Sequence, residues 1–116
     1  TCKHTIEEFF DEYGYVLDPH TAVAVDVCNC FVDYSGNDKP TIVLSTASPY
    51  KFAHDVLTAL KGKAPADAFL ASDKLALETA LPVPEQILSL KDKQKRFTKV
   101  IEKGETFDAV LDFITK

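Results

Sequence analysis

The chain has 116 residues, which is enough for one domain or for part of one. Its composition, 46% hydrophobic and 27% charged, excludes wholesale disorder, and no apolar run approaches the ~20 residues that span a bilayer, so we expect a soluble, cytoplasmic protein. The formal net charge of −5 argues against a nucleic-acid surface, which normally carries a concentrated basic excess.

Two helices are predicted in the first third of the chain. The first starts in the capping box Thr5-Ile6-Glu7-Glu8, shows apolar residues at helical spacing and ends at Gly14. The second has Asp18 as its N-cap and Pro19 at its first position, and it runs to Tyr34. Its apolar residues lie on most sides, so it needs burial on more than one face. We therefore expect an exposed apolar patch or self-association in a chain this short.

A β-branched run at residues 41–45 predicts a strand that leads directly into a third helix. Ser48 is the expected N-cap of that helix, Pro49 takes the first helical position, and Gly62 ends it. The free N–H groups and the positive dipole end of the helix would face the crevice beyond the strand. Open α/β sheets usually bind ligands at that place, and anionic groups bind best.

The second half of the chain predicts three more helices and one more strand. Ser72-Asp73-Lys74 caps a short fourth helix, residues 84–90 begin a fifth, and a clean apolar stripe follows Gly104. Residues 97–102 form the second strand candidate. The prediction is an α/β chain with about six helices and two strands. Because two strands make a poor sheet, we infer that residues 41–45 belong to a larger sheet whose other strands lie elsewhere.

The three cysteines do not predict a metal site or a disulfide framework. Cys28 and Cys30 fall on the second helix, where a spacing of two residues points them about 200° apart around the axis. They cannot both face one metal ion. Reduced thiols are therefore expected, and no histidine supplies a spacing that completes a ligand set.

Two blocks of sequence together resemble the C-terminal part of threonine synthase, a pyridoxal-phosphate enzyme of the tryptophan-synthase-like fold (fold type II). The blocks are Asp18-Pro19-His20-Thr21-Ala22 and Thr46-Ala47-Ser48-Pro49-Tyr50-Lys51-Phe52, in the order and spacing that the family shows. Ser48 stands where many family members have His. The resemblance covers about residues 5–60, with a weaker similarity at residues 95–97. It implies that residues 1–116 are a single C-terminal segment of an incomplete catalytic domain.

The absence of Met agrees with that reading, because a whole gene product begins with Met and this chain begins with Thr1. We expect an excised or processed piece whose partner is the remainder of the same polypeptide. The resemblance implies that the whole enzyme converts O-phospho-L-homoserine and water to L-threonine and phosphate. The net charge and the lack of a long apolar run predict that neither nucleic acid nor a membrane is a partner.

The resemblance implies specific site residues. Thr46 occupies the position whose hydroxyl binds the pyridine nitrogen of pyridoxal phosphate in relatives of this fold. Ser45, Ser48 and Lys51 could line the same crevice and hold phosphate, or they could serve only in capping and solvation. No lysine has the sequence context of the Schiff-base lysine. The segment is therefore expected to hold no catalytic residue and to have no activity alone.

The first block has an ordinary structural reading as well. Asp18 caps a helix and Thr21 lies three residues further on, as in many helix starts, with His20 between them. Structure alone can explain these residue types, and we expect a structural role for them.

Two other readings of the chain remain open. In the first, the chain is a free-standing α/β module that binds a phosphorylated small molecule or a carboxylate at the Ser48 helix end without chemistry. In the second, it is a purely structural piece that serves a subunit or domain contact.

Overall fold

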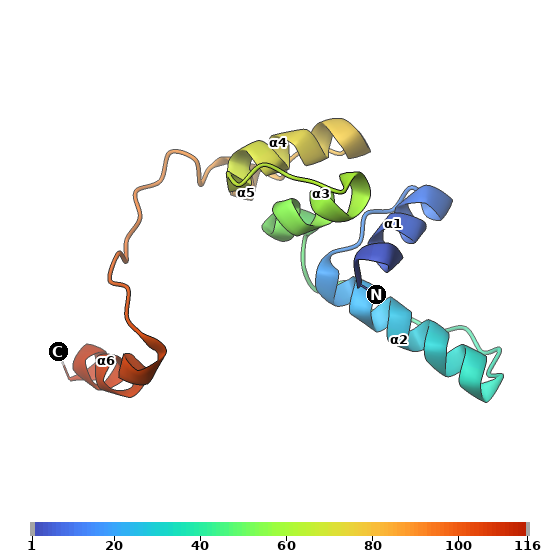
Figure 1. Cartoon of the computed structure of the whole chain (residues 1–116), viewed down its shortest axis with the longest axis horizontal. Helices are drawn as coiled ribbons and strands as arrows, with labels where there is room; N and C mark the ends of the chain where they lie inside the picture. Colours follow the sequence, from blue (N-terminus) through green and yellow to red (C-terminus); the bar gives the residue numbers. More distant parts are fainter. Residues whose placement is uncertain (1, 116) are drawn as a thin grey trace.

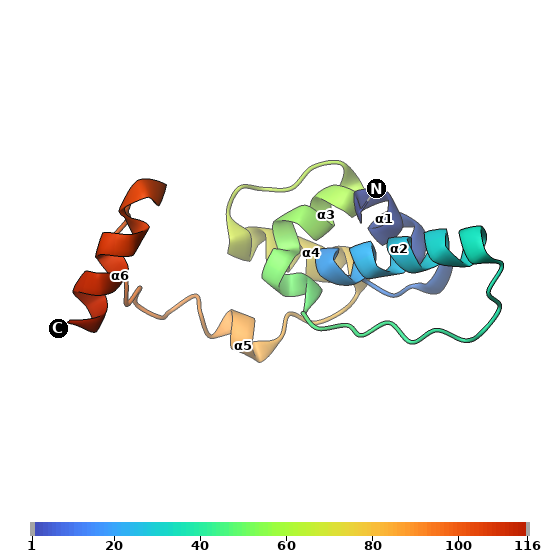
Figure 2. The same ribbon diagram turned by 90° about the horizontal axis from the view of Figure 1, so that it is seen from below.

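Helices make up all the regular structure of the computed structural model, which describes residues 2–115 (Figure 1). The first four α-helices gather into one cluster, in which α1 packs on α2 and α3, and α3 packs on α4. The last helix lies apart from the cluster at the end of an extended segment (Figures 1 and 2). In chain order the elements are α1 (Cys2–Tyr13), α2 (Pro19–Ser35), the 3₁₀ helix η1 (Pro49–Phe52), α3 (Ala53–Lys61), α4 (Ala68–Thr79), α5 (Glu85–Leu88), the 3₁₀ helix η2 (Lys103–Glu105) and α6 (Thr106–Ile114).

A small hydrophobic core lies where α1, the first turns of α2, α3 and α4 meet. Ile6, Val56 and Leu75 are its largest fully buried apolar side chains, and they come from three different helices. Removing these side chains from water supplies most of the stabilisation of the cluster. The other buried apolar residues are Val16, Leu17, Ala22, Val25, Tyr50, Ala53, Leu57, Ala59 and Ala71.

The predicted strands are absent, so the α/β prediction is wrong for residues 2–115. Residues 41–45 are extended but pair with no neighbouring strand, and residues 97–102 also lack strand pairing. A strand is stabilised by ladder hydrogen bonds and cross-strand contacts, and a β-branched run alone supplies neither. Both segments therefore remain as extended connections.

The predicted starts of the second and third helices are confirmed. Asp18 caps α2 through its side chain, and Ser48 Oγ accepts a hydrogen bond of 3.3 Å from the Tyr50 amide. The first turn after Ser48 is the 3₁₀ helix η1, which continues directly into α3. Helix α3 ends at Gly62, as predicted.

The predicted start of the fourth helix is wrong by about one turn. Asp67 is its N-cap and accepts from the Leu70 amide at 2.7 Å. Ser72 lies inside the helix, where its hydroxyl donates to the Ala68 carbonyl at 2.9 Å. Serine is found both as a helix N-cap and inside a helix, where its hydroxyl bonds to a carbonyl of the preceding turn, and the local sequence does not distinguish the two. Tertiary packing of the preceding residues decides between them.

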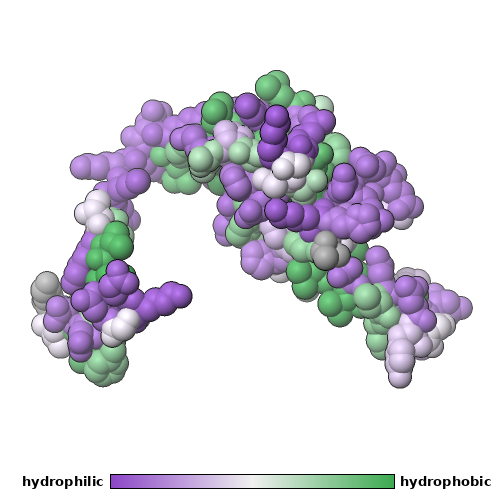
Figure 3. Space-filling view, viewed as in Figure 1, coloured by the Kyte–Doolittle hydropathy of each residue, from purple (hydrophilic) through white to green (hydrophobic). Residues whose placement is uncertain are grey.

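Exposed apolar residues concentrate on two helices, as was expected for α2. Val23, Val27 and Phe31 of α2 are more than half exposed, and so are Phe107 and Phe113 of α6. Figure 3 shows apolar surface over these parts of the molecule. None of the helices in residues 2–115 has both the length and the apolar character that a membrane span requires.

Ala80 is the only non-glycine residue with a positive φ among residues 2–115, at 56°. It forms the left-handed C-cap of α4, a position where glycine avoids the strain of a Cβ atom. We expect Ala80→Gly to raise the free energy of unfolding by about 1 kcal/mol, measured by urea denaturation. The control Ala76→Gly, inside the same helix, should lower it by about 1 kcal/mol. Destabilisation by both changes would contradict the strained cap.

Candidate functional site

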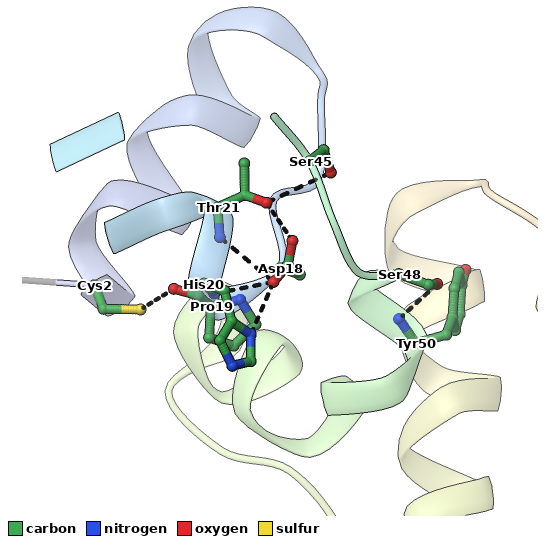
Figure 4. A network of polar contacts seen from close by, with 8 residues as sticks. All are labelled: Cys2, Asp18, Pro19, His20, Thr21, Ser45, Ser48 and Tyr50. Atoms are coloured by element: carbon green, nitrogen blue, oxygen red, sulfur yellow. Dashed lines mark hydrogen bonds and ion pairs between the residues drawn. The ribbon is translucent and has the colours of Figure 1, made fainter. Parts of the chain in front are cut away.

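The Asp18 carboxylate is the centre of a polar network at the start of α2. Its residue is only 1% exposed, because the preceding Val16 and Leu17 are buried in the core and draw the chain inward. Oδ1 accepts from the His20 amide at 2.9 Å and the Thr21 amide at 3.4 Å, and it lies 3.1 Å from His20 Nδ1. Oδ2 accepts a short hydrogen bond from the Thr21 hydroxyl (Figure 4).

These hydrogen bonds keep the buried carboxylate charged. Burial raises the pKa of Asp18, but the hydrogen bonds from the Thr21 hydroxyl, from the His20 and Thr21 amides and from the His20 ring outweigh burial. The net effect is a pKa below the ordinary aspartate value. Asp18 is therefore an acceptor-only group, and all its neighbours must donate to it.

The first sequence block lies against residues 45–52, which are Ser45 and the second block. Thr21 Oγ1 is 3.5 Å from Ser45 Oγ, and the His20 ring contacts the Phe52 ring with centroids 4.9 Å apart. The first contact joins residues 24 positions apart in the chain. Figure 4 shows Ser45 and Ser48 on the segment that passes the start of α2. Helix α2 thus contacts the segment 45–52 at both of its ends, Ser45 and Phe52.

The predicted site residues lie along this second block, mostly on its exposed side. Ser45, Thr46 and Lys51 are exposed, whereas Ser48 is half-buried. The Thr46 hydroxyl has no hydrogen bond to any residue of 2–115. The Lys51 ammonium lies 6.0 Å from the centre of the Phe52 ring and has no carboxylate partner in the described part of the chain.

Asp18, His20 and Thr21 do more than start a helix. Sequence reasoning assigned them a structural role, and the caps confirm that part, but their side chains also reach the second block. Local spacing contains no information about such a contact. The only sequence signal was the presence of both blocks in one chain.

A separate apolar groove of about 560 Å³ runs between η1, the start of α4 and α5. Its lining includes Lys51, Phe52, Phe69 and Ile87. Ser45, Thr46 and Ser48 do not take part. The predicted site residues are therefore not gathered in one hollow of this chain.

All three cysteines are free thiols. Cys2 donates to the Pro19 carbonyl at 3.3 Å, and burial raises its pKa, so the thiolate is disfavoured. In the described residues, no group of three or more His, Cys, Asp or Glu side chains is placed to hold a metal ion.

Comparison with known proteins gives the family. Residues 21–114 match the family described as "Threonine synthase, C-terminal". The chain belongs to this family. The resemblance inferred from the two blocks is thereby confirmed. The second block lies wholly inside the region matched to the threonine synthase C-terminal family, and Thr21 is its first matched residue.

Three curated relatives are all named "Threonine synthase-like 1". The mouse (Mus musculus) protein is 36% identical over 96 residues, which is 81% of this chain and 12% of the relative. The Pongo abelii protein is 44% identical and the Homo sapiens protein 42% identical, each over 62 residues, 53% of this chain and 8% of the relative. This member of the threonine synthase C-terminal family thus spans about an eighth, or less, of the length of these relatives.

Proposed function

We propose that this chain is the C-terminal segment of a pyridoxal-phosphate enzyme that converts O-phospho-L-homoserine and water to L-threonine and phosphate. In this proposal it forms one wall of the active site, and the remainder of the same polypeptide forms the others. The observation that carries the proposal is the contact of the first block with residues 45–52. It holds Ser45 and Phe52 in place and leaves Thr46, which lies between them, exposed and without a partner.

The residues present fit one edge of the cofactor. The free Thr46 hydroxyl can donate a hydrogen bond to the pyridine nitrogen, and a hydroxyl, unlike a carboxylate, does not favour a charged ring. When bound, pyridoxal phosphate supplies an electron sink for the bonds around the substrate Cα. A neutral ring withdraws electrons less strongly, which suits elimination and replacement of a leaving group.

We propose that the phosphate group of the substrate contacts Lys51 and Ser48, with Ser45 beside them. The Lys51 ammonium is exposed and has no ion pair within residues 2–115, so its charge is available to an anion. Ser48 Oγ accepts from the Tyr50 amide, which leaves its own proton free for donation. These groups would hold the leaving phosphate, and none of them is assigned a proton transfer.

No lysine of the chain has the sequence context of the Schiff-base lysine, and we propose that the chain supplies no covalent anchor for the cofactor and has no turnover alone. The free-standing binding module receives less support. It requires free amides at a helix N-terminus, but the Tyr50 amide is bonded to Ser48 Oγ and the Lys51 amide to the Ser48 carbonyl.

The test is release of phosphate from O-phospho-L-homoserine by the complete polypeptide that contains this segment, saturated with pyridoxal phosphate. Lys51→Gln should raise KM about tenfold with little change in kcat, because one charge-assisted hydrogen bond to the substrate is lost. Lys63 is an exposed lysine in the connector before α4. The matched control Lys63→Gln should change neither KM nor kcat. Absence of phosphate release by the unmodified complete protein would refute the proposed reaction.

A further inference from the structure

We infer that Asp18 is a positioning residue for the segment that carries Thr46, and that it acts through Thr21 at one end of the segment and His20 at the other. The inference concerns how the segment is held, and its consequence for turnover rests on the proposed function.

The first connection is a directed chain of hydroxyl groups. Thr21 has one hydroxyl proton, and the short bond to Asp18 Oδ2 uses it, because a carboxylate only accepts. The contact of 3.5 Å between Thr21 Oγ1 and Ser45 Oγ must then take its proton from Ser45. The charge on Asp18 thereby fixes the orientation of the Ser45 hydroxyl, directly before Thr46.

The second connection uses the His20 ring. Asp18 Oδ1 lies 3.1 Å from Nδ1 of this ring, which holds the imidazole at the start of α2 although its side chain is 65% exposed. The ring packs at 58° against Phe52, the last residue of η1. One buried carboxylate therefore reaches both ends of the segment 45–52.

The segment needs such anchors because no sheet holds it. Residues 41–46 have no strand partner within residues 2–115, and Leu44, Ser45 and Thr46 are exposed. Fixing the backbone of each residue costs conformational entropy, which contacts must offset. The contacts of Ser45 and Phe52 with α2, on either side of Thr46, take over the role that ladder hydrogen bonds were expected to have.

The experiment measures backbone order in the 116-residue chain by ¹⁵N relaxation, without cofactor or substrate. Thr21→Val keeps the shape of the side chain and removes its hydroxyl, whereas Thr21→Ser keeps the hydroxyl. We expect Thr21→Val to lower the order parameters of Ser45 and Thr46 from about 0.85 toward 0.6, and Thr21→Ser to retain them. Thr58→Val, which removes a hydroxyl bonded within α3 at 2.7 Å, is the control and should leave Ser45 and Thr46 unchanged.

In the complete enzyme, Thr21→Val should lower kcat about tenfold at temperatures where the protein is fully folded, with rescue by Thr21→Ser. Unchanged order parameters in Thr21→Val, or an equal effect of Thr58→Val, would overturn the positioning role. Because the relaxation measurement needs no cofactor, that failure is distinct from absence of phosphate release by the unmodified enzyme, which would refute the proposed function instead.

Discussion

Replacing Thr46 by Val in the complete enzyme is expected to lower turnover about tenfold to a hundredfold and to leave thermal stability unchanged. The side chain is exposed and makes no hydrogen bond within residues 2–115, so the fold loses nothing when the hydroxyl is removed. Under the proposed function, the same hydroxyl is the donor to the pyridine nitrogen. Loss of one preorganised hydrogen-bond donor to a reacting group lowers the reaction rate by a factor of this order.

The measurement is kcat for phosphate release together with the visible absorbance of the bound cofactor, which should shift when the ring nitrogen loses its partner. Thr46→Ser keeps the hydroxyl and should retain most of the activity. Thr41→Val is the matched control, since Thr41 is also exposed on the same extended segment and, within residues 2–115, its hydroxyl donates only to the Lys39 carbonyl at 3.4 Å. Wild-type kinetics in Thr46→Val would remove this residue from the site.

Replacing Asp18 by Ala is expected to lower the free energy of unfolding of the 116-residue chain by about 3 kcal/mol, measured by urea denaturation. Loss of a helix N-cap costs about 1 kcal/mol, and the buried Thr21 hydroxyl also loses the carboxylate that accepts its proton. Asp18→Asn should cost only about 1 kcal/mol, because asparagine caps helices as well as aspartate does. An effect of Asp18→Ala below a few tenths of a kcal/mol would contradict the network.

The difference in free energy of unfolding between the wild type and Asp18→Asn should depend on pH. The pKa of Asp18 in the folded chain lies below its ordinary value of 3.8, so the unfolded chain binds a proton more readily in acid. The stabilising contribution is therefore complete above pH 3.8 and is lost as the pH falls through the lower folded pKa. The stability difference between the wild type and Asp18→Asn should shrink over that acid range.

Helix starts and ends were predictable because they depend on a few neighbouring residues. Asp18 with Pro19, and Ser48 with Pro49, cap their helices as the sequence predicts, since the side-chain acceptor and the amide that it bonds lie within three positions. Gly36 and Gly62 end α2 and α3 with positive φ for the same local reason. The start of α4 was misplaced because Ser72 is also compatible with a position inside a helix.

Residues 41–45 and 97–102 alone could not reveal that both segments lack strand pairing. Their β-branched composition fits a strand, but a strand exists only where another strand offers its backbone groups, and residues 2–115 offer none. The contact between Thr21 and Ser45, across 24 positions, could not be derived from local spacing for a similar reason.

The amino-acid sequence by itself determined the starts of the second and third helices, because a cap depends on residues close together in the chain, and the two blocks indicated the family. It did not determine every helix start: α1 begins at Cys2, ahead of the predicted capping box at Thr5, and α4 begins after Asp67. Only the tertiary structure decided that Asp18 and Thr21 reach Ser45, that Thr46 is exposed, and that residues 41–45 form no strand. The physical reason is that packing of α1, α2, α3 and α4 sets these distances, whereas local propensity does not.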